Sequence, residues 1–160
     1  MQRTDKFLIG IVAGIVILVG TGFAVMLLRP RPTYLPDNTP GGVANNYLLA
    51  VQRGEYERAY GYLSPDLPGY PSDPATFARQ VGLGNGYNST SSVEVTDVQE
   101  TGERATVSFE ETTFYEGGLF GSDSYQSTFQ MRLIRQAGQW RIEHSDSFWA
   151  WCLDQPEGCE

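Results

Sequence analysis

The stretch FQMRLIRQAGQWRI, residues 129–142, decides how the second half of the chain folds. Apolar residues alternate with polar ones on both sides of the turn QAGQ: Phe129, Met131, Leu133, Trp140 and Ile142. A period of two on either side of a tight turn predicts an antiparallel hairpin with one buried face and one wet face.

Two further strands precede this hairpin. Residues 93–95 and 105–109 show the same alternation, and the turns ETGE and EGGLFGSD separate the strands. The pattern therefore predicts a four-stranded antiparallel sheet. Phe114 falls out of phase with residues 105–109, so we expect a β-bulge near Glu110–Thr112.

Three helices are expected before the sheet, over residues 39–53, 55–63 and 74–81. Thr39 and Asp73 are good N-cap residues, and each is followed by a proline, which suits the first helical position. Helices followed by a sheet make an α+β domain.

Residues 7–28, FLIGIVAGIVILVGTGFAVMLL, contain no charge. An α-helix needs roughly 20 apolar residues to cross a bilayer, so this run predicts a transmembrane helix after a short cytoplasmic N-terminus, residues 1–6. A cleaved signal peptide is the alternative, but its apolar region is about 7–15 residues long and ends at a small-x-small site. Gly22-Phe23-Ala24 is a poor version of such a site, so we favour an uncleaved anchor.

Two positively charged residues flank this run on each side, so the positive-inside rule does not decide its orientation. Residues 33–160, however, carry seven arginines, no lysine and 18 acidic side chains, a formal charge of −11. A segment so poor in positive charge crosses a membrane readily. We therefore predict a single-pass plasma-membrane protein with its N-terminus in the cytoplasm and its domain outside. The acidity also excludes nucleic acid as a partner.

A proline-rich segment, RPRPTYLPDNTP, joins the two parts. Four prolines in residues 29–40 favour an extended chain, so residues 29–38 are predicted to form a semi-rigid stalk. The domain then spans residues 39–151, and residues 152–160 form a C-terminal tail.

Two segments resemble a known superfamily. GEYERAYGYLSPD, residues 54–66, resembles a helix–turn segment of nuclear transport factor 2-like (cystatin-like) domains, and GQWRIEHSDSF, residues 138–148, resembles their last strand. The overall plan is similar to bacterial membrane-anchored members, either lumazine-binding-like or uncharacterised. Over residues 39–150 the resemblance implies a cone-shaped domain, in which about three helices on a curved sheet enclose a cavity.

The tail contains both cysteines, Cys152 and Cys159. Six residues separate them, whereas metal sites usually begin with cysteines two to four residues apart and redox dithiols with Cys-x-x-Cys. The turn at residues 156–158 brings them together, and closing this loop constrains the unfolded chain by roughly 2–2.5 kcal/mol in the entropy model. We predict a structural disulfide, with no metal site and no cofactor.

His144 is the only histidine. If the alternation of Trp140 and Ile142 continues, His144 faces the core side near the end of its strand. There it either lines a cavity mouth as a general base or is a partly buried histidine bonded to a carbonyl or carboxylate, which we favour. The cavity candidates are His144, Trp140, Tyr47 and Tyr60.

Enzymes of the superfamily pair a pocket aspartate with a tyrosine or histidine. Asp97 and Asp146 are available for such a pair, but no catalytic motif matches, so no catalytic residue is assigned. Leu119 and Phe120 lie between glycines at a predicted hairpin tip. They either contact a partner or the membrane, or fold back onto the sheet.

These features predict a non-catalytic membrane-anchored domain outside the cell that binds a small ligand or a protein partner. An accessory subunit of an envelope assembly is equally compatible with the sequence, as is a homodimer. The alternative is an isomerase, cyclase or dehydratase that uses the cavity of the fold.

Overall fold

The computed structural model describes residues 3–28, 32–84, 91–117 and 121–158. The chain divides into two compact units, Met1–Thr33 and Tyr34–Glu160. Each unit is described by itself.

The first unit contains one long apolar helix, α1 (Arg3–Leu28). Its segment Leu8–Val25 has a mean hydropathy of 2.6 and is long and apolar enough to cross a membrane. The hydroxyl of Thr21 donates to the carbonyl of Ile17 at 2.8 Å. The polar group of this segment is therefore bonded within the helix, as a lipid environment requires.

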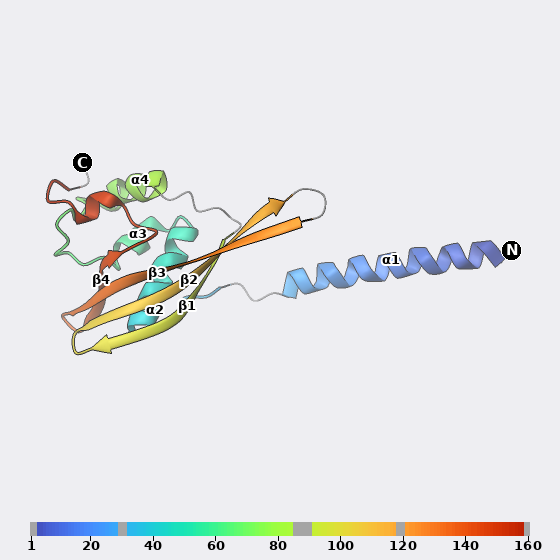
Figure 1. Ribbon diagram of the computed structural model, residues 1–160, viewed down its shortest axis with the longest axis horizontal. Helices are drawn as coiled ribbons and strands as arrows, with labels where there is room; N and C mark the ends of the chain where they lie inside the picture. Colours follow the sequence, from blue (N-terminus) through green and yellow to red (C-terminus); the bar gives the residue numbers. More distant parts are fainter. Residues whose placement is uncertain (1–2, 29–31, 85–90, 118–120, 159–160) are drawn as a thin grey trace. The chain divides into compact units, whose positions relative to one another are not determined.

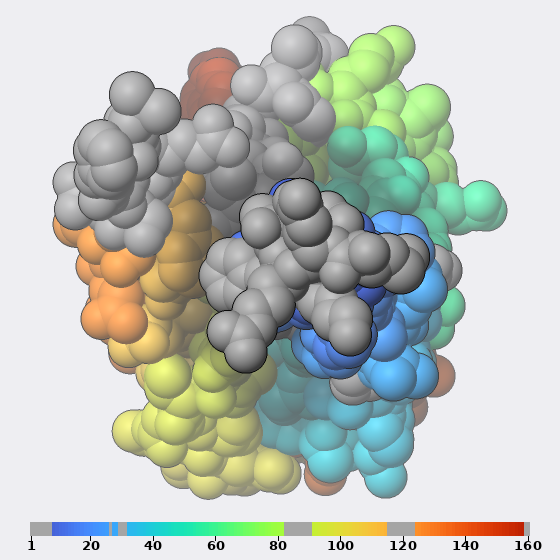
Figure 2. All heavy atoms as spheres, turned by 90° about the vertical axis from the view of Figure 1, so that its right-hand side faces the viewer, coloured from blue at the N-terminus to red at the C-terminus, as the bar shows by residue number. Residues whose placement is uncertain are grey.

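The second unit is an α+β domain, as predicted (Figure 1). Its elements are α2 (Pro40–Gln52), α3 (Tyr56–Tyr60), α4 (Pro74–Gly84), β1 (Ser91–Thr101), β2 (Arg104–Gly117), β3 (Gly121–Gln136), β4 (Gln139–Ser145) and the short 3-10 helix η1 (Trp151–Asp154). The strands pair antiparallel in the order β1-β2-β3-β4, which confirms the predicted four-stranded meander. The atoms of strands β1–β3 (yellow to orange) and of the helices (cyan to green) form two layers in Figure 2.

The helices begin at the predicted caps. The hydroxyl of Thr39 accepts from the backbone N–H of Gly42 at 3.1 Å, at the start of α2. The carboxylate of Asp73 accepts from the backbone N–H groups of Ala75 and Thr76 at the start of α4. Hydrogen bonds from the backbone and the hydroxyl of Thr76 hold the pKa of Asp73 below its usual value.

The core lies between the helices and one face of the sheet. Tyr47 of α2 and Phe77 of α4 are fully buried, and they face strand residues of the predicted alternating pattern, including Phe109, Met131 and Leu133. The alternation therefore identified the buried face of β2 and β3 correctly, whereas in β1 Val93 is half-buried and Val95 is exposed.

The outer edge of β4 is covered by the chain that follows α3. Leu63 forms a parallel bridge with Ile142. The N–H of Ile142 donates to the carbonyl of Tyr62 at 2.9 Å, and the N–H of Ser64 donates to the carbonyl of Ile142 at 2.8 Å. The second predicted helix thus ends at Tyr60, earlier than expected, because residues 62–64 pair with β4 instead.

The predicted bulge near Glu110–Thr112 is wrong. The β2–β3 register is continuous from Arg104↔Ile134 to Gly117↔Gly121. Phe114 is out of phase because it lies on the outer face. The irregularities occur elsewhere, between Val95 and Asp97 of β1 and opposite Arg132/Leu133 in β4.

The end of the predicted stalk is bonded to the domain. The backbone N–H and C=O of Leu35 both bond the side-chain amide of Asn46, at 2.8 and 2.7 Å. The carboxylate of Asp37 accepts from the same amide at 2.6 Å and from the hydroxyl of Tyr62 at 3.1 Å. The chain is therefore part of the second unit from Tyr34 onward.

Candidate functional site

A bulge in β4 turns His144 away from the core. Leu133 pairs with Ile142, but Arg132 pairs with His144, so Glu143 is an extra residue in β4. Paired residues of antiparallel strands point to the same face, and an extra residue reverses the alternation beyond it. His144 therefore shares the outer face with Arg132, and Ser145 takes the buried position. The expected core-side orientation of His144 was wrong for this reason.

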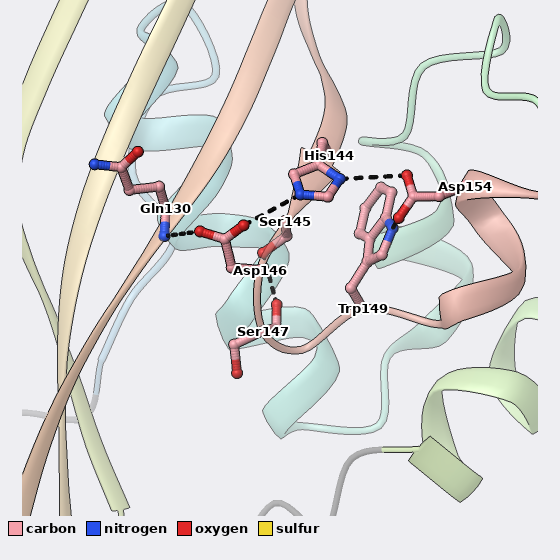
Figure 3. Close-up of polar contacts among 7 residues, drawn as sticks. All are labelled: Gln130, His144, Ser145, Asp146, Ser147, Trp149 and Asp154. Carbon is pink, nitrogen blue, oxygen red and sulfur yellow. Dashed lines mark hydrogen bonds and ion pairs between the residues drawn. The ribbon is translucent and has the colours of Figure 1, made fainter.

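His144 lies between two carboxylates (Figure 3). Its Nε2 is 3.2 Å from Oδ1 of Asp146, and its Nδ1 is 3.3 Å from Oδ1 of Asp154. The indole Nε1 of Trp149 donates to Oδ2 of Asp154 at 2.9 Å. The histidine is thus partly buried and bonded to carboxylates, which is the arrangement that we favoured over a general base in a cavity.

The two carboxylates come from different parts of the chain. Asp146 directly follows β4 and is held on β3, because its Oδ2 accepts from the backbone N–H of Gln130 at 3.1 Å. Asp154 is the last residue of η1. The ring of His144 thus lies between a carboxylate that follows β4 and a carboxylate of η1.

His144, Asp146, Trp149 and Asp154 form a polar cluster. A polar groove of about 460 Å³ adjoins this cluster, because Asp154 belongs to the cluster and also lines the groove. Its charged lining residues are Asp66, Arg104, Arg132, Glu143 and Asp154. The volume is within the range of small-molecule sites, roughly 300–1,000 Å³.

Arg104 and Glu143 form an ion pair of 2.7 Å in this groove. They belong to β2 and β4, and β3 lies between these strands, so the pair reaches across the outer face of β3. Arg132 of β3 differs. Within the described part of the chain, no carboxylate lies within ion-pair distance of its exposed guanidinium group.

Neutral residues complete the groove. Ile134 lies on the outer face of β3, and Leu67 and Pro68 of the loop after α3 form an apolar wall. Gln136, at the end of β3, donates from its amide to Oδ2 of Asp66 at 2.6 Å.

A second groove, of about 390 Å³, includes Trp140 together with Asp37, Arg58 and Tyr62. Trp140 is buried, and the guanidinium of Arg135 lies 4.7 Å from the centre of its ring. Its Nε1 is a buried donor that has no hydrogen-bond partner among the described residues. Trp140 is therefore separate from the cluster around His144.

Tyr47 and Tyr60 lie on the core side. The Tyr47 hydroxyl donates to the carbonyl of Phe148 at 2.8 Å, and burial raises the pKa of Tyr47 far above its usual value. The Tyr60 hydroxyl donates to the carbonyl of Pro71 at 3.0 Å. The rings of Tyr47 and Tyr60 both contact Phe77, with centroids 6.4 and 6.1 Å apart.

The four predicted cavity residues thus do not line one common cavity. Tyr47 and Tyr60 meet around Phe77, whereas Trp140 and His144 line separate surface features. Aromatic rings, including those of Phe129, Phe148 and Trp149, pack in the space between the helices and the sheet. Leu119, Phe120 and Cys159 lie outside the described residues, so their predicted roles stay predictions.

The predicted partner of Cys159, Cys152, is buried in η1. No group of three or more His, Cys, Asp or Glu side chains in the described ranges could hold a metal ion.

The sequence missed the groove. The alternation does predict that the groove residues Arg132 and Ile134 lie on the outer face of the sheet, because they alternate with the buried Met131 and Leu133. No sequence pattern joins these positions to Asp66 and Asp154, which the tertiary fold brings to the edge of the sheet.

No protein-family model matches the chain. No curated protein matches it either. Several solved structures are similar to it. A SEC-C motif containing protein from Rhodopseudomonas palustris has 15% identity over 70% of this chain and 80% of that chain, with a TM-score of 0.49.

Two other similar structures come from Shewanella. An NTF-2-like protein of unknown function from Shewanella oneidensis has 10% identity over 64% of this chain and 90% of that chain, with a TM-score of 0.43. A protein provisionally named a ketosteroid isomerase, from Shewanella frigidimarina, has 16% identity over 71% and 98%, with a TM-score of 0.45. Nuclear transport factor 2-like proteins are thus among the solved structures that are similar to this chain.

Proposed function

We propose that this protein is a non-catalytic, single-pass membrane protein whose extracytoplasmic domain binds a small ligand, or a short segment of a partner protein, through the groove beside His144. One observation carries the proposal: in a strongly acidic domain, the guanidinium of Arg132 lies exposed in a groove, and no described carboxylate pairs with it. A guanidinium binds carboxylates and phosphates through parallel N–H donors. A ligand with an anionic group fits this position.

The surroundings of His144 favour binding over catalysis. The His144 side chain is 27% exposed and the Asp146 side chain 55%, so both members of this pair are in contact with solvent. General acid–base catalysis is most effective in a site that excludes water. On the core side, aromatic rings pack in the region where an enzyme of this fold would need a cavity.

The membrane attachment rests on α1 and on the acidity of the domain. The segment Leu8–Val25 is long enough to span a bilayer, and the chain from Tyr34 onward is bonded to the domain. An anchor of this kind suits a domain that acts at the outer surface of the plasma membrane, alone or as part of an envelope assembly.

The orientation predicts protease sensitivity from outside. In bacterial spheroplasts that express the full chain, we expect added protease to remove the domain while a cytoplasmic marker stays intact. We also expect Cys152 and Cys159 to react with a thiol-specific polymer only after reduction, because an oxidising compartment permits the disulfide. Protection of the domain until the spheroplasts are lysed would contradict the orientation.

Anion binding at Arg132 is tested with a carboxylate probe, N-acetyl-alanyl-leucine, added to the full chain in detergent micelles. We expect saturable binding by calorimetry, weakened about ten- to hundredfold in Arg132→Gln, since hydrogen bonds to charged groups contribute about 1.5–3 kcal/mol. Arg79→Gln is the control, because Arg79 is an exposed arginine of α4 outside the groove. Binding that is absent, or equal in Arg132→Gln, would overturn the proposed function.

A further inference from the structure

We infer that the groove recognises a short zwitterion of peptide size, with its carboxylate at Arg132 and its ammonium at Asp66. This inference rests on the proposed function and adds the ligand class. It starts from the charges that remain in the groove once the internal pairs are formed.

Three of the charged residues have charged or ring N–H partners. Arg104 pairs with Glu143, and Asp154 bonds the His144 ring and the Trp149 indole. The guanidinium of Arg132 and the carboxylate of Asp66 have no charged or ring N–H partner of this kind. The side-chain partner of Asp66 is the neutral amide of Gln136, and no cationic group among the described residues lies within ion-pair distance of it.

These two charges lie near the two ends of the segment Arg132–Gln136 of β3, because Asp66 is bonded to Gln136. Arg132, Ile134 and Gln136 all line the groove from β3, and Gln136 holds the carboxylate of Asp66. Because a strand rises about 3.3 Å per residue, the Cα atoms of Arg132 and Gln136 are about 13 Å apart. The Arg132 side chain and the Asp66–Gln136 pair occupy part of the distance between these two Cα atoms. A ligand that contacts both Arg132 and Asp66 therefore needs its two charged groups several ångströms apart.

This spacing selects the size of the ligand. In a free amino acid the ammonium and the carboxylate are attached to the same carbon, so they are too close to reach both ends. An extended dipeptide separates its terminal charges by about 7 Å, at roughly 3.3–3.6 Å per residue. The groove fits a dipeptide or tripeptide, or a compound of similar length with an amine at one end and an acid at the other.

The middle of the groove supports the same assignment. Ile134 lies between Arg132 and Gln136 on β3, and Leu67 and Pro68, which follow Asp66, also line the groove. Ile134, Leu67 and Pro68 offer apolar contacts to a ligand side chain and do not bind a charge. The Arg104–Glu143 pair crosses β3 in this region and is matched internally, so it adds no net charge that would repel either end of a zwitterion.

Three probes test the inference against the full chain in micelles: alanyl-leucine, N-acetyl-alanyl-leucine and alanyl-leucinamide. We expect alanyl-leucine to bind about ten- to hundredfold more tightly than either blocked peptide, because each blocked peptide loses one charge-assisted contact. In Asp66→Asn, alanyl-leucine and its acetylated form should bind equally. Glu57→Gln, an exposed carboxylate outside the groove, is the control and should keep the preference.

The outcomes separate the two proposals. Equal binding of alanyl-leucine and its acetylated form to the unmodified protein would overturn the zwitterion and leave anion binding at Arg132 standing. Equal binding of alanyl-leucine and its amide would overturn both, since the carboxylate would then have no role. A preference that survives in Asp66→Asn, with an unchanged thermal midpoint, would overturn the assignment of the ammonium to Asp66.

Discussion

Replacing Tyr47 with alanine is expected to lower the free energy of unfolding of the domain by about 3–5 kcal/mol. The Tyr47 side chain is 0% exposed, and its ring contacts Phe77 and Trp149. The substitution leaves a cavity at the centre of the aromatic core and removes the hydrogen bond to the carbonyl of Phe148. A domain stability of 5–15 kcal/mol makes this a large part of the total.

Two further variants of the full chain separate the contribution of the Tyr47 hydroxyl from that of its buried ring. Tyr47→Phe keeps the ring and loses the hydroxyl, so it should cost about 1 kcal/mol. Tyr125→Ala removes an aromatic ring that is 61% exposed and should change stability by less than about 0.5 kcal/mol. Denaturant unfolding in micelles measures all three. A Tyr47→Ala effect as small as that of Tyr125→Ala would mean that the core is not packed around Tyr47.

Gly69→Ala is expected to destabilise the attachment of η1 by at least about 3 kcal/mol. A Cβ atom at Gly69 would overlap the carbonyl oxygen of Cys152 and lie 2.9 Å from that of Gln155. Both obstacles are backbone, so η1 must move away. The movement would break the hydrogen bond from the Gly69 N–H to the carbonyl of Leu153 and expose the fully buried Leu153 side chain.

The control for this clash is Gly41→Ala. A Cβ at Gly41 would meet the end of the Val98 side chain at 3.3 Å, and this side chain is partly exposed and can shift. Alanine is also the better helix former by about 1 kcal/mol, so this variant should be neutral or slightly more stable. Hydrogen exchange of the η1 amides measures the local effect. Unchanged protection in Gly69→Ala would show that η1 does not pack on Gly69.

The cluster around His144 shows where prediction from the sequence failed. The alternation of Phe129, Met131 and Leu133 assigned the buried face of β3 correctly, because side chains of a regular strand alternate with a period of two. The same rule misplaced His144, because Glu143 is an extra residue in β4 and one inserted residue reverses every orientation beyond it. Nothing in the local composition of QWRIEHS marks the bulge.

The sequence by itself determined the apolar helix, the acidic charge, the order of helices and strands and the buried face of β2 and β3. These features depend on local propensity and on periodicity, which short segments carry. The tertiary structure alone decided that residues 62–64 close the edge of β4 and that η1 packs on Gly69. It also decided that Asp66, Arg132 and Asp154 line one groove. These residues are far apart in the chain, so their meeting depends on the packing of loops whose positions no periodic pattern encodes.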